Sequence, residues 1–337
     1  MRLVRTLTTA GILFFFCIAP LAIAQSSPMV VSIQVSPAEA STPASHLWYH
    51  IRPASTGAAK MLPSTALSNK PAATASAVPR SEMYPANLSY HGGHVVKNAE
   101  QHPVYFNCPA GPTACWGNPA VFLNNLDHSA FIHLVDQYVG SSANNRYPLG
   151  AAVSIHQTLQ TNRLDQNDIG NLVHAAAVKL GKHGGYTEIY HVFLPKGIDV
   201  CLGLGSICYS PDDPGSFSFC AYHGSADFDD IGHVLFTVQP YQNVIGCQSA
   251  QPSPNGVLID STASILSHET FETITDPDGS SWWSDSSMIE SGQEIGDICE
   301  PLDNDNSQFD DPIFSVNGKS YRIQLEYSNK FHGCTHQ

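Results

Sequence analysis

The residues best suited to chemistry lie in one short stretch, LSHETFETITDP, at positions 266–277. His268 and Glu269 are adjacent, and Glu272 follows four residues after His268. Zinc peptidases carry His-Glu-x-x-His on a helix, where both histidines bind the metal and the glutamate acts as general base. Here Glu272 takes the place of the second histidine. Zinc accepts imidazole nitrogen and carboxylate oxygen, so the stretch predicts a zinc site with one ligand exchanged.

A helix over residues 261–275 is expected to position these side chains. The segment contains no Gly or Pro, and Ser261 or Thr262 can cap its N-terminus. Pro277 disfavours helical geometry at Asp276, so we predict that the helix ends there.

On such a helix His268 and Glu272 lie one turn apart, with Cβ atoms about 6 Å from each other. Both can therefore bind one ion, while Glu269 beside them can accept a proton from a water on that ion. A carboxylate ligand adds negative charge, which makes the metal a poorer Lewis acid. The alternative is that these residues form the solvent-facing side of an ordinary amphipathic helix.

A catalytic zinc site needs three protein ligands and an open position for water. We favour Glu294, in the segment QEIGDICE, as the third ligand, because a tryptophan-containing loop can return the chain to the helix. Asp297 is expected to support a ligand or to replace Glu294 as one. Asp276 and Asp278, just past the helix, are further alternative ligands. A surface turn is the competing interpretation of Glu294 and Asp297.

The chain is acidic, with 29 Asp and Glu against 15 Lys and Arg. Without the arginines of residues 1–24 its charge is about −16, which argues against a nucleic-acid partner because such proteins need a basic surface. Fourteen acids lie in residues 257–312, which contain no Lys or Arg. We expect most of them to form a solvated acidic face and a few to hold a metal.

Another cation motif is the acidic segment 302–311, in which Asp303, Asp305 and Ser307 alternate. It resembles a calcium loop, but it lacks the Gly and the final Glu of an EF-hand. A solvated loop is the preferred interpretation, and calcium is the weaker alternative to zinc as a cofactor.

His223 lies in the segment FCAYHG, three residues after Cys220. It is either a site residue brought near the helix or a structural histidine packed under a disulfide, and the second role is the more common one. Ser/His/Asp catalysis has no support, because the sequence contains no Gly-x-Ser-x-Gly elbow.

Residues 1–24 have the features of a secretory signal peptide. Arg2 and Arg5 precede the apolar run GILFFFCIAPLAIA, which ends in small residues suited to cleavage. The run is too short to span a bilayer, so a membrane anchor is the less favoured alternative. Residues 25–87 are rich in Ala, Ser, Pro and Thr and are predicted to form a flexible leader. We expect a secreted, extracellular or periplasmic protein without a membrane partner in its mature form.

Eight cysteines remain after Cys17 leaves with the signal peptide. An even number in an exported chain indicates disulfides. Sequence alone leaves the connectivity open, but pairing of neighbours along the chain favours four bonds: Cys108–Cys115, Cys201–Cys208, Cys220–Cys247 and Cys299–Cys334. No Cys-x-x-Cys pair occurs in the sequence, which argues against a thiolate zinc site.

Helical and strand patterns mix over residues 88–337. Two segments have apolar residues three and four apart and are predicted helices, namely 118–139 and 166–185, the second with a stop at Gly181. Strands are predicted at 186–195, 233–241 and 319–328. The mixture predicts one α/β or α+β domain over 88–337, with a mixed sheet stabilised by disulfides.

Several motifs follow one another in the C-terminal third: SHETFETITDP, SWW, EIGDICE and FSVNGKSYRIQLEYSNKFHGC. This order resembles the exordium or phosphate-induced protein family, which has a His-Glu-x-x-Glu helix, Thr-Asn-Pro, an aromatic stretch, EIADLCE and a closing Cys. The resemblance covers residues 90–337 and is firm over 266–334. The matching positions are His268, Glu269, Glu272, Thr275, Pro277, Trp282, Trp283, Glu294, Ile295, Asp297, Cys299, Glu300, Gly318, Gln324 and Cys334. The chain departs from the pattern at Asp276, where Asn is usual.

The resemblance implies a secreted or wall-associated protein. Its helix and downstream glutamate look like those of a zincin peptidase, which implies a zincin-like active helix with zinc on His268, Glu272 and Glu294 and with Glu269 as the base. The predicted function is therefore a secreted, zinc metallopeptidase-like hydrolase acting on peptides. The alternative is a non-catalytic extracellular or cell-wall-associated protein that binds a polymer, a partner or calcium.

Overall fold

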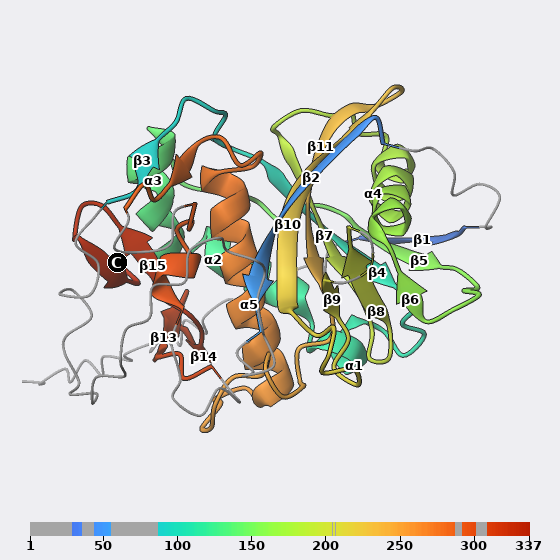
Figure 1. Cartoon of the computed structure of the whole chain (residues 1–337). Helices are drawn as coiled ribbons and strands as arrows, with labels where there is room; N and C mark the ends of the chain where they lie inside the picture. The colour runs from blue at the N-terminus through green and yellow to red at the C-terminus, as the bar shows by residue number, and fades with distance from the viewer. Residues whose placement is uncertain are drawn as a thin grey trace, which may run out of the picture.

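The computed structural model has a mixed α/β architecture built on one large sheet (Figure 1). It describes residues 29–35, 44–54, 87–203, 205, 207–286, 292–300 and 309–337. The main sheet has seven strands, and helices cover both of its faces. This arrangement confirms the predicted mixed-sheet α/β class.

Five neighbouring strands of the main sheet run parallel. In spatial order they are β1 (Val30–Gln34), β5 (Ala152–His156), β4 (Glu100–Phe106), β7 (Glu188–Phe193) and β11 (Gly232–Gln239). β10 (Phe219–Phe228) and β2 (His46–Pro53) then continue the sheet in antiparallel pairs. β4, β7 and β11 are almost fully buried, as expected of parallel strands covered on both faces. The strands predicted over 186–195 and 233–241 correspond to β7 and β11.

The prediction of a flexible leader over residues 25–87 is wrong for two segments, because β1 and β2 both lie in the main sheet. β2 alternates in the manner of a strand: Leu47, Tyr49 and Ile51 pack against the core on one face, so Trp48 and His50 lie on the other. The Ala, Ser and Pro around this short pattern hid it in the sequence. The predicted signal peptide, residues 1–24, lies outside the described residues.

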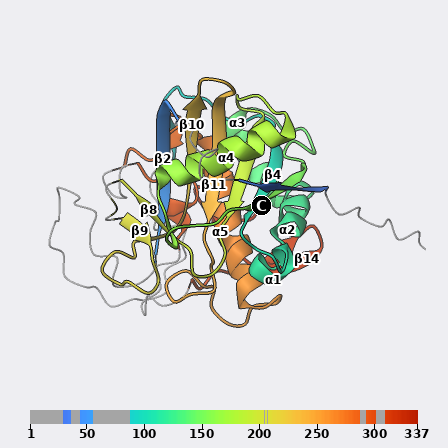
Figure 2. The same ribbon diagram turned by 90° about the vertical axis from the view of Figure 1, so that its right-hand side faces the viewer.

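α4 (Gln166–Leu180) covers one face of the sheet (Figure 2). It begins after Asp165, whose carboxylate accepts hydrogen bonds from two backbone N–H groups of the first turn. The backbone N–H of Asp165 in turn donates to the Asp168 carboxylate, which completes a capping box. It ends at Gly181, which adopts a left-handed backbone conformation that glycine tolerates because it has no Cβ. Ile169 and Leu172 pack against the strands. The helix predicted over 166–185 is confirmed.

The opposite face of the sheet carries several helices. They are α1 (Pro112–Trp116), α2 (Pro119–Asp127), the 3₁₀ helix η2 (Phe131–Val135), α3 (Asp136–Val139) and α5 (Val257–Thr275). The prediction of one helix over 118–139 is wrong, because this segment is interrupted between α2 and η2. Ser129 donates its hydroxyl to the Leu126 carbonyl at 2.7 Å, and its backbone N–H bonds to the same oxygen, so the chain turns there instead of continuing.

α5 lies between the main sheet and the C-terminal hairpins, and every residue from Asp260 to Thr275 is buried. The alternative of a solvent-facing polar side is therefore wrong. Many of its residues are Ser or Thr, and most of their hydroxyls bond within the helix. Thr270 donates to the Leu266 carbonyl and Thr273 to the Glu269 carbonyl, each at 2.6 Å. These bonds satisfy most of the hydroxyls of the buried helix.

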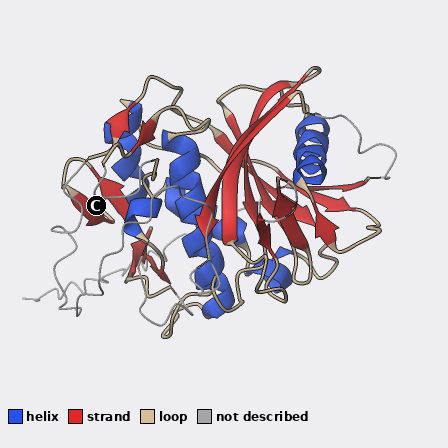
Figure 3. Cartoon of the chain, in the orientation of Figure 1, coloured by secondary structure: helices blue, strands red, loops and turns tan. Residues whose placement is uncertain are grey.

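The remaining strands form small sheets around this framework (Figure 3). The pairs are β3 (Ser89–Tyr90) with β12 (Trp282–Trp283), β13 (Ile313–Val316) with β14 (Lys319–Arg322), and β15 (Glu326–Ser328) with β16 (Gly333–Thr335); β6 (Arg163–Leu164), β8 (Asp199–Leu202) and β9 (Ile207–Tyr209) form a three-stranded sheet. The prediction of one strand over 319–328 is wrong in extent, because β14 and β15 pair with different partners. A short 3₁₀ helix, η3 (Asp297–Cys299), precedes β13.

All four predicted cysteine pairs lie at bonding distance, which confirms the disulfide prediction. The Cys220–Cys247 bond ties the start of β10 to the loop that leads into α5, and the Cys299–Cys334 bond ties η3 to β16. Within the described part of the chain, no helix is long and apolar enough to cross a membrane.

Candidate metal centre

Histidines and carboxylates from four parts of the chain meet between the sheet and α5. α5 supplies His268, Glu269 and Glu272, and β10 supplies His223. The other members are His50 from β2 and the pair Glu294 and Asp297, at and just before η3. His223, His268, Glu269 and Glu272 are fully buried, and Glu294 is 2% exposed. The surface-turn interpretation of Glu294 is therefore wrong.

Glu272 lies between two imidazole rings. Its Oε1 atom is 3.1 Å from Nε2 of His268, and its Oε2 atom is 3.4 Å from Nδ1 of His223. Oε2 of Glu269 lies 3.3 Å from the same His223 nitrogen. Ligand atoms that share a tetrahedral zinc ion at about 2.1 Å lie about 3.4 Å from one another, so these separations match those of a common coordination sphere.

The two buried rings are oriented by their other nitrogens. Nδ1 of His268 lies 3.3 Å from Oε1 of Gln324, whose amide in turn donates to the Gly296 carbonyl at 2.5 Å. Nε2 of His223 lies 3.3 Å from the Asp276 carbonyl. A ring nitrogen that faces an oxygen acceptor carries a proton, so in the neutral imidazole that binds a metal the opposite nitrogen would offer its lone pair on the carboxylate side. Metal-binding histidines are held in this way.

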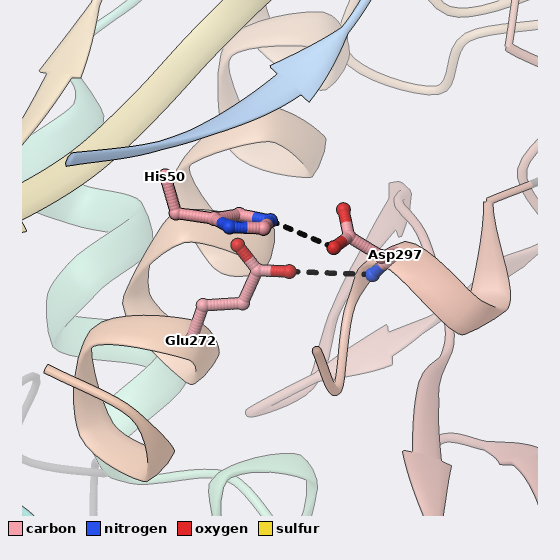
Figure 4. A group of neighbouring side chains, drawn as sticks. All are labelled: His50, Glu272 and Asp297. Atoms are coloured by element: carbon pink, nitrogen blue, oxygen red, sulfur yellow. Dashed lines mark hydrogen bonds and ion pairs between the residues drawn. The ribbon is translucent and has the colours of Figure 1, made fainter. Parts of the chain in front are cut away.

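Asp297 lies next to His50 and Glu272 (Figure 4), and Glu294 contacts the same histidine. Nδ1 of His50 lies 3.5 Å from Oε1 of Glu294, and its Nε2 lies 2.8 Å from Oδ2 of Asp297. The backbone N–H of Asp297 donates to Oε1 of Glu272 at 3.2 Å. Asp297 therefore positions both His50 and Glu272, in line with its expected supporting role.

The structure groups the candidate ligands differently from the trio predicted from the sequence. Among the described residues, the sets whose ligand atoms lie within 4.8 Å of one another at this centre are His268, Glu269, Glu272; His223, Glu272, Glu294; and His50, Glu272, Asp297. Glu272 belongs to all of them. Glu294 is grouped with His223 rather than with His268, so the predicted trio of His268, Glu272 and Glu294 is not brought together as one set within the described chain.

The alternative ligands Asp276 and Asp278 have other roles. Oδ1 of Asp276 accepts the backbone N–H groups of Ser280 and Ser281 at 2.6 and 2.7 Å, which closes the turn after α5. Asp278 pairs with His233 at 3.0 Å and accepts the Tyr186 hydroxyl at 2.6 Å. Asp278 therefore lies in a separate ion-pair group. The weak calcium segment, including Asp303, Asp305 and Ser307, lies outside the described residues except for its last three positions.

Several buried atoms of the cluster have no hydrogen-bond partner. They are Nδ1 of His223, Nε2 of His268, both carboxylate oxygens of Glu269, Oε2 of Glu272, Oε2 of Glu294 and Oδ2 of Asp276. An unpaired buried donor or acceptor costs about 1–3 kcal/mol, and more when it is charged. These are the nitrogen and oxygen atoms that a divalent cation binds, so the residues present fit such an ion.

The carboxylates raise the pKa values of both buried histidines. Burial lowers the pKa of His223, but its contacts with Glu269 and Glu272 outweigh burial and raise the pKa to about 10. Burial also lowers the pKa of His268, and Glu272 again outweighs it and raises the pKa to about 10. A bound cation would oppose this protonation, because metal ligation requires neutral imidazole. Protons and metal therefore compete for the same nitrogen atoms.

The surrounding acids show that negative charge is in excess. Burial and the nearby acids raise the pKa of Glu294 well above its usual value. Burial raises the pKa of Asp276 to about 6 and that of Glu300 to about 7, and it raises the pKa of Glu326 well above its usual value. Arg52 offsets part of this charge through its 3.0 Å ion pair with Glu300. The excess that remains favours binding of a cation.

A pocket of about 330 Å³ lies beside the cluster. Glu294, His50 and Asp276 line it together with Trp48 and Trp283, whereas His268 is not among its lining residues. The pocket therefore gives access to the Glu294 side of the centre. Its two tryptophans offer apolar walls to a ligand.

A second group of histidine and carboxylate side chains lies on the main sheet and contains a lysine. Glu100, His102 and Glu188 lie close enough to share a cation. Lys182 already occupies that position, with Nζ at 2.5 Å from Glu100 and 3.2 Å from Glu188. Since the lysine neutralises the carboxylates, this group is an ion-pair network.

Sequence reasoning missed His50 and left the role of His223 open. The sequence motif FCAYHG drew attention to His223, but only the position of β10 in the sheet shows that His223 lies against α5. The signal that could have found His50 is the alternation of apolar and polar residues in HLWYHIRP.

A scan against protein-family models and searches of curated proteins and solved structures find no match to this chain. The fold and the site together define a disulfide-containing mixed α/β protein with a buried centre of histidines and carboxylates suited to a metal ion. The resemblance to the exordium family remains an expectation from sequence.

Proposed function

We propose that the chain is a secreted, exordium-like zinc hydrolase that cleaves peptide bonds. The observation that carries the proposal is the pair of imidazoles around Glu272, with unpaired buried ligand atoms, beside an accessible pocket. The four disulfides support the extracellular location, because such bonds persist in oxidising compartments.

Glu294 lines the pocket, and its set of His223, Glu272 and Glu294 would hold the catalytic zinc. Three protein ligands leave a position open, as catalytic zinc sites require. A zinc ion there supplies Lewis acidity toward a water and a peptide carbonyl. This assignment replaces His268 of the sequence prediction by His223, because Glu294 lies with His223.

Glu269 is the proposed general base. Both of its oxygens are buried and without hydrogen-bond partners, and Oε2 lies 3.3 Å from the His223 nitrogen that would bind the metal. Burial raises the pKa of Glu269, which moves the carboxylate toward the range where a base works near neutral pH. The base would accept its proton at one of these oxygens.

Trp48 and Trp283 are proposed to hold the substrate chain beside the centre, since they line the pocket together with Glu294. The same aromatic walls also fit the alternative function, a non-catalytic extracellular protein that binds a polymer. Carboxylate ligands weaken the Lewis acidity of the metal, which is a physical reason to keep that alternative.

The test combines metal analysis with the Glu269→Gln variant. Purified wild-type protein is expected to contain zinc and to cleave a peptide library. Glu269→Gln is expected to keep the zinc ion held by His223, Glu272 and Glu294 and to lose about 10²–10⁴-fold in turnover. A wild-type protein that binds no metal would overturn the proposal. Metal binding without any hydrolysis would leave the non-catalytic alternative.

A further inference from the structure

The two carboxylate oxygens of Glu272 face in different directions, toward different histidines. Oε2 faces Nδ1 of His223 on the sheet side, and Oε1 faces Nε2 of His268 on the same helix. Both nitrogens are fully buried and have no hydrogen-bond partner. A single ion held by His223, Glu272 and Glu294 would leave the His268 nitrogen with its 3.1 Å ion pair to Oε1 of Glu272 and no ligand role.

We propose that the centre binds two divalent cations bridged by the carboxylate of Glu272. The outer cation is the one held by His223, Glu272 and Glu294, and this inference rests on the function proposed above. The inner cation is held by His268, by Oε1 of Glu272 and by one carboxylate oxygen of Glu269, whose other oxygen remains available as the base. Carboxylate-bridged pairs of metal ions are common in hydrolases.

The geometry of the two sets supports this division. Each set has one imidazole and two carboxylates, and their ligand atoms lie within 4.8 Å of one another. Glu272 and Glu269 are one turn or less from His268 on α5, so the helix itself fixes the inner set. The outer set joins α5 to β10 and to the segment before η3.

Two further features fit an inner ion that is closed to solvent. Gln324 orients His268, as residues behind a metal ligand do. Gly296 packs so closely against the inner set that a side chain would clash there. An added Cβ would lie 2.5 Å from Nδ1 of His268 and 2.9 Å from Oε1 of Glu272. Glu294 is the one proposed ligand of either ion that lines the pocket, and it belongs to the outer set, so substrate is expected to meet the outer ion.

The chemical class of the inner ion follows from its ligands. One imidazole with carboxylate oxygens suits zinc or manganese better than calcium, which prefers six to eight oxygen ligands.

The experiment counts metal ions per chain by elemental analysis after loading with zinc, together with native mass spectrometry. Wild type is expected to bind two ions. His268→Ala is expected to bind one, and the matched control His174→Gln, at an exposed ion pair with Asp230, to bind two. One ion in wild type would overturn the bridged pair while leaving the proposed function intact. No ion in wild type would overturn both.

A second measurement needs no variant. Wild-type protein loaded with Mn²⁺ is expected to show an exchange-coupled electron paramagnetic resonance spectrum, because a bridging carboxylate couples neighbouring ions. Two bound ions with the separate six-line spectra of isolated Mn²⁺ would overturn the role of Glu272 as a bridge. Circular dichroism of each variant establishes that a lost ion reflects a lost ligand and not an unfolded protein.

Discussion

His50 on β2 and His223 on β10 are directly opposite each other in the antiparallel register, with ring centroids 5.8 Å apart. One lies in the amino-terminal segment that composition marks as a leader, and the other lies 173 positions later. The strand pairing therefore makes residues 46–53 a part of the candidate site. His50 contacts Glu294 and Asp297, and through Asp297 it is linked to Glu272.

The first prediction concerns His50→Ala. This change removes the 2.8 Å contact to Asp297 and the nearby charge that holds Glu294. We expect metal affinity to fall about 10–100-fold, as it does when residues that support ligands are lost. Competition with a chromogenic chelator measures the affinity.

The matched control is His46→Ala on the same strand. His46 lies 4.0 Å from the exposed Asp227, away from the centre, and its loss should leave metal affinity unchanged. Equal affinities for wild type and His50→Ala would show that β2 does not support the site.

The second prediction concerns Gly296→Ala. The Gly296 backbone, with φ −80°, is accessible to any residue, so the substitution tests whether a Cβ fits beside His268 and not whether the backbone is strained. A Cβ within 2.5 Å of the His268 ring must displace it. We expect lost or weakened metal binding and a fall in thermal stability, measured by metal content and calorimetry.

Gly170→Ala is the comparison substitution for this test. Gly170 lies inside α4, and an added Cβ there would meet only Leu47, at 3.8 Å. Alanine in a helix is favoured by about 0.5–1 kcal/mol over glycine. We expect this variant to be slightly stabilised and to keep its metal. A Gly296→Ala protein with normal metal content would contradict the tight packing at His268.

The third prediction concerns the Cys220–Cys247 disulfide. It closes a 27-residue separation between β10 and the approach to α5, the two elements that supply His223 and His268. Loss of a loop closure of this size costs about 3–4 kcal/mol of unfolding free energy. Denaturant titration of the double variant Cys220→Ala, Cys247→Ala should show this loss. A change below 1 kcal/mol would mean that other contacts hold β10 in place.

The fourth prediction concerns pH and the ion pair between His233 and Asp278. Asp278, and after it Asp227, raises the pKa of His233 despite burial. The contribution of His233 to stability is therefore fully present below its unfolded pKa of about 6.5 and is lost as pH rises through the folded value. Burial raises the pKa of Asp278, but His233 and Tyr186 outweigh it and lower the pKa to about 2. The Asp278 contribution is therefore present above about pH 4 and is lost as pH falls toward 2.

The pair should thus contribute most between about pH 4 and 6.5. The side chains are 23% and 21% exposed, and with solvent screening we expect about 1–2 kcal/mol. Unfolding of wild type and His233→Gln by urea at pH 5.5 and at high pH measures it. The difference between the two proteins should shrink at the higher pH, and a constant difference would rule out titration of His233 as its source.

Local features of this protein were predictable from its residues. The end of α4 at Gly181, the end of α5 before Pro277 and the i to i+4 spacing of His268 and Glu272 depend on neighbours within one or two turns. The disulfides were predictable because each cysteine pairs with its neighbour along the chain.

The tertiary structure decided the composition of the site. That Glu294 lies with His223 and His50, and not with His268, follows from the order and register of β2, β10 and β11 and from the path of the chain into η3. Those pairings join residues far apart in sequence, and their free energy comes from burial and packing that no local pattern encodes. For the same reason α5 has polar residues on one side of its sequence yet is buried all round: the sheet and the hairpins pack against it from opposite sides, which brings its acids together as a candidate cation site.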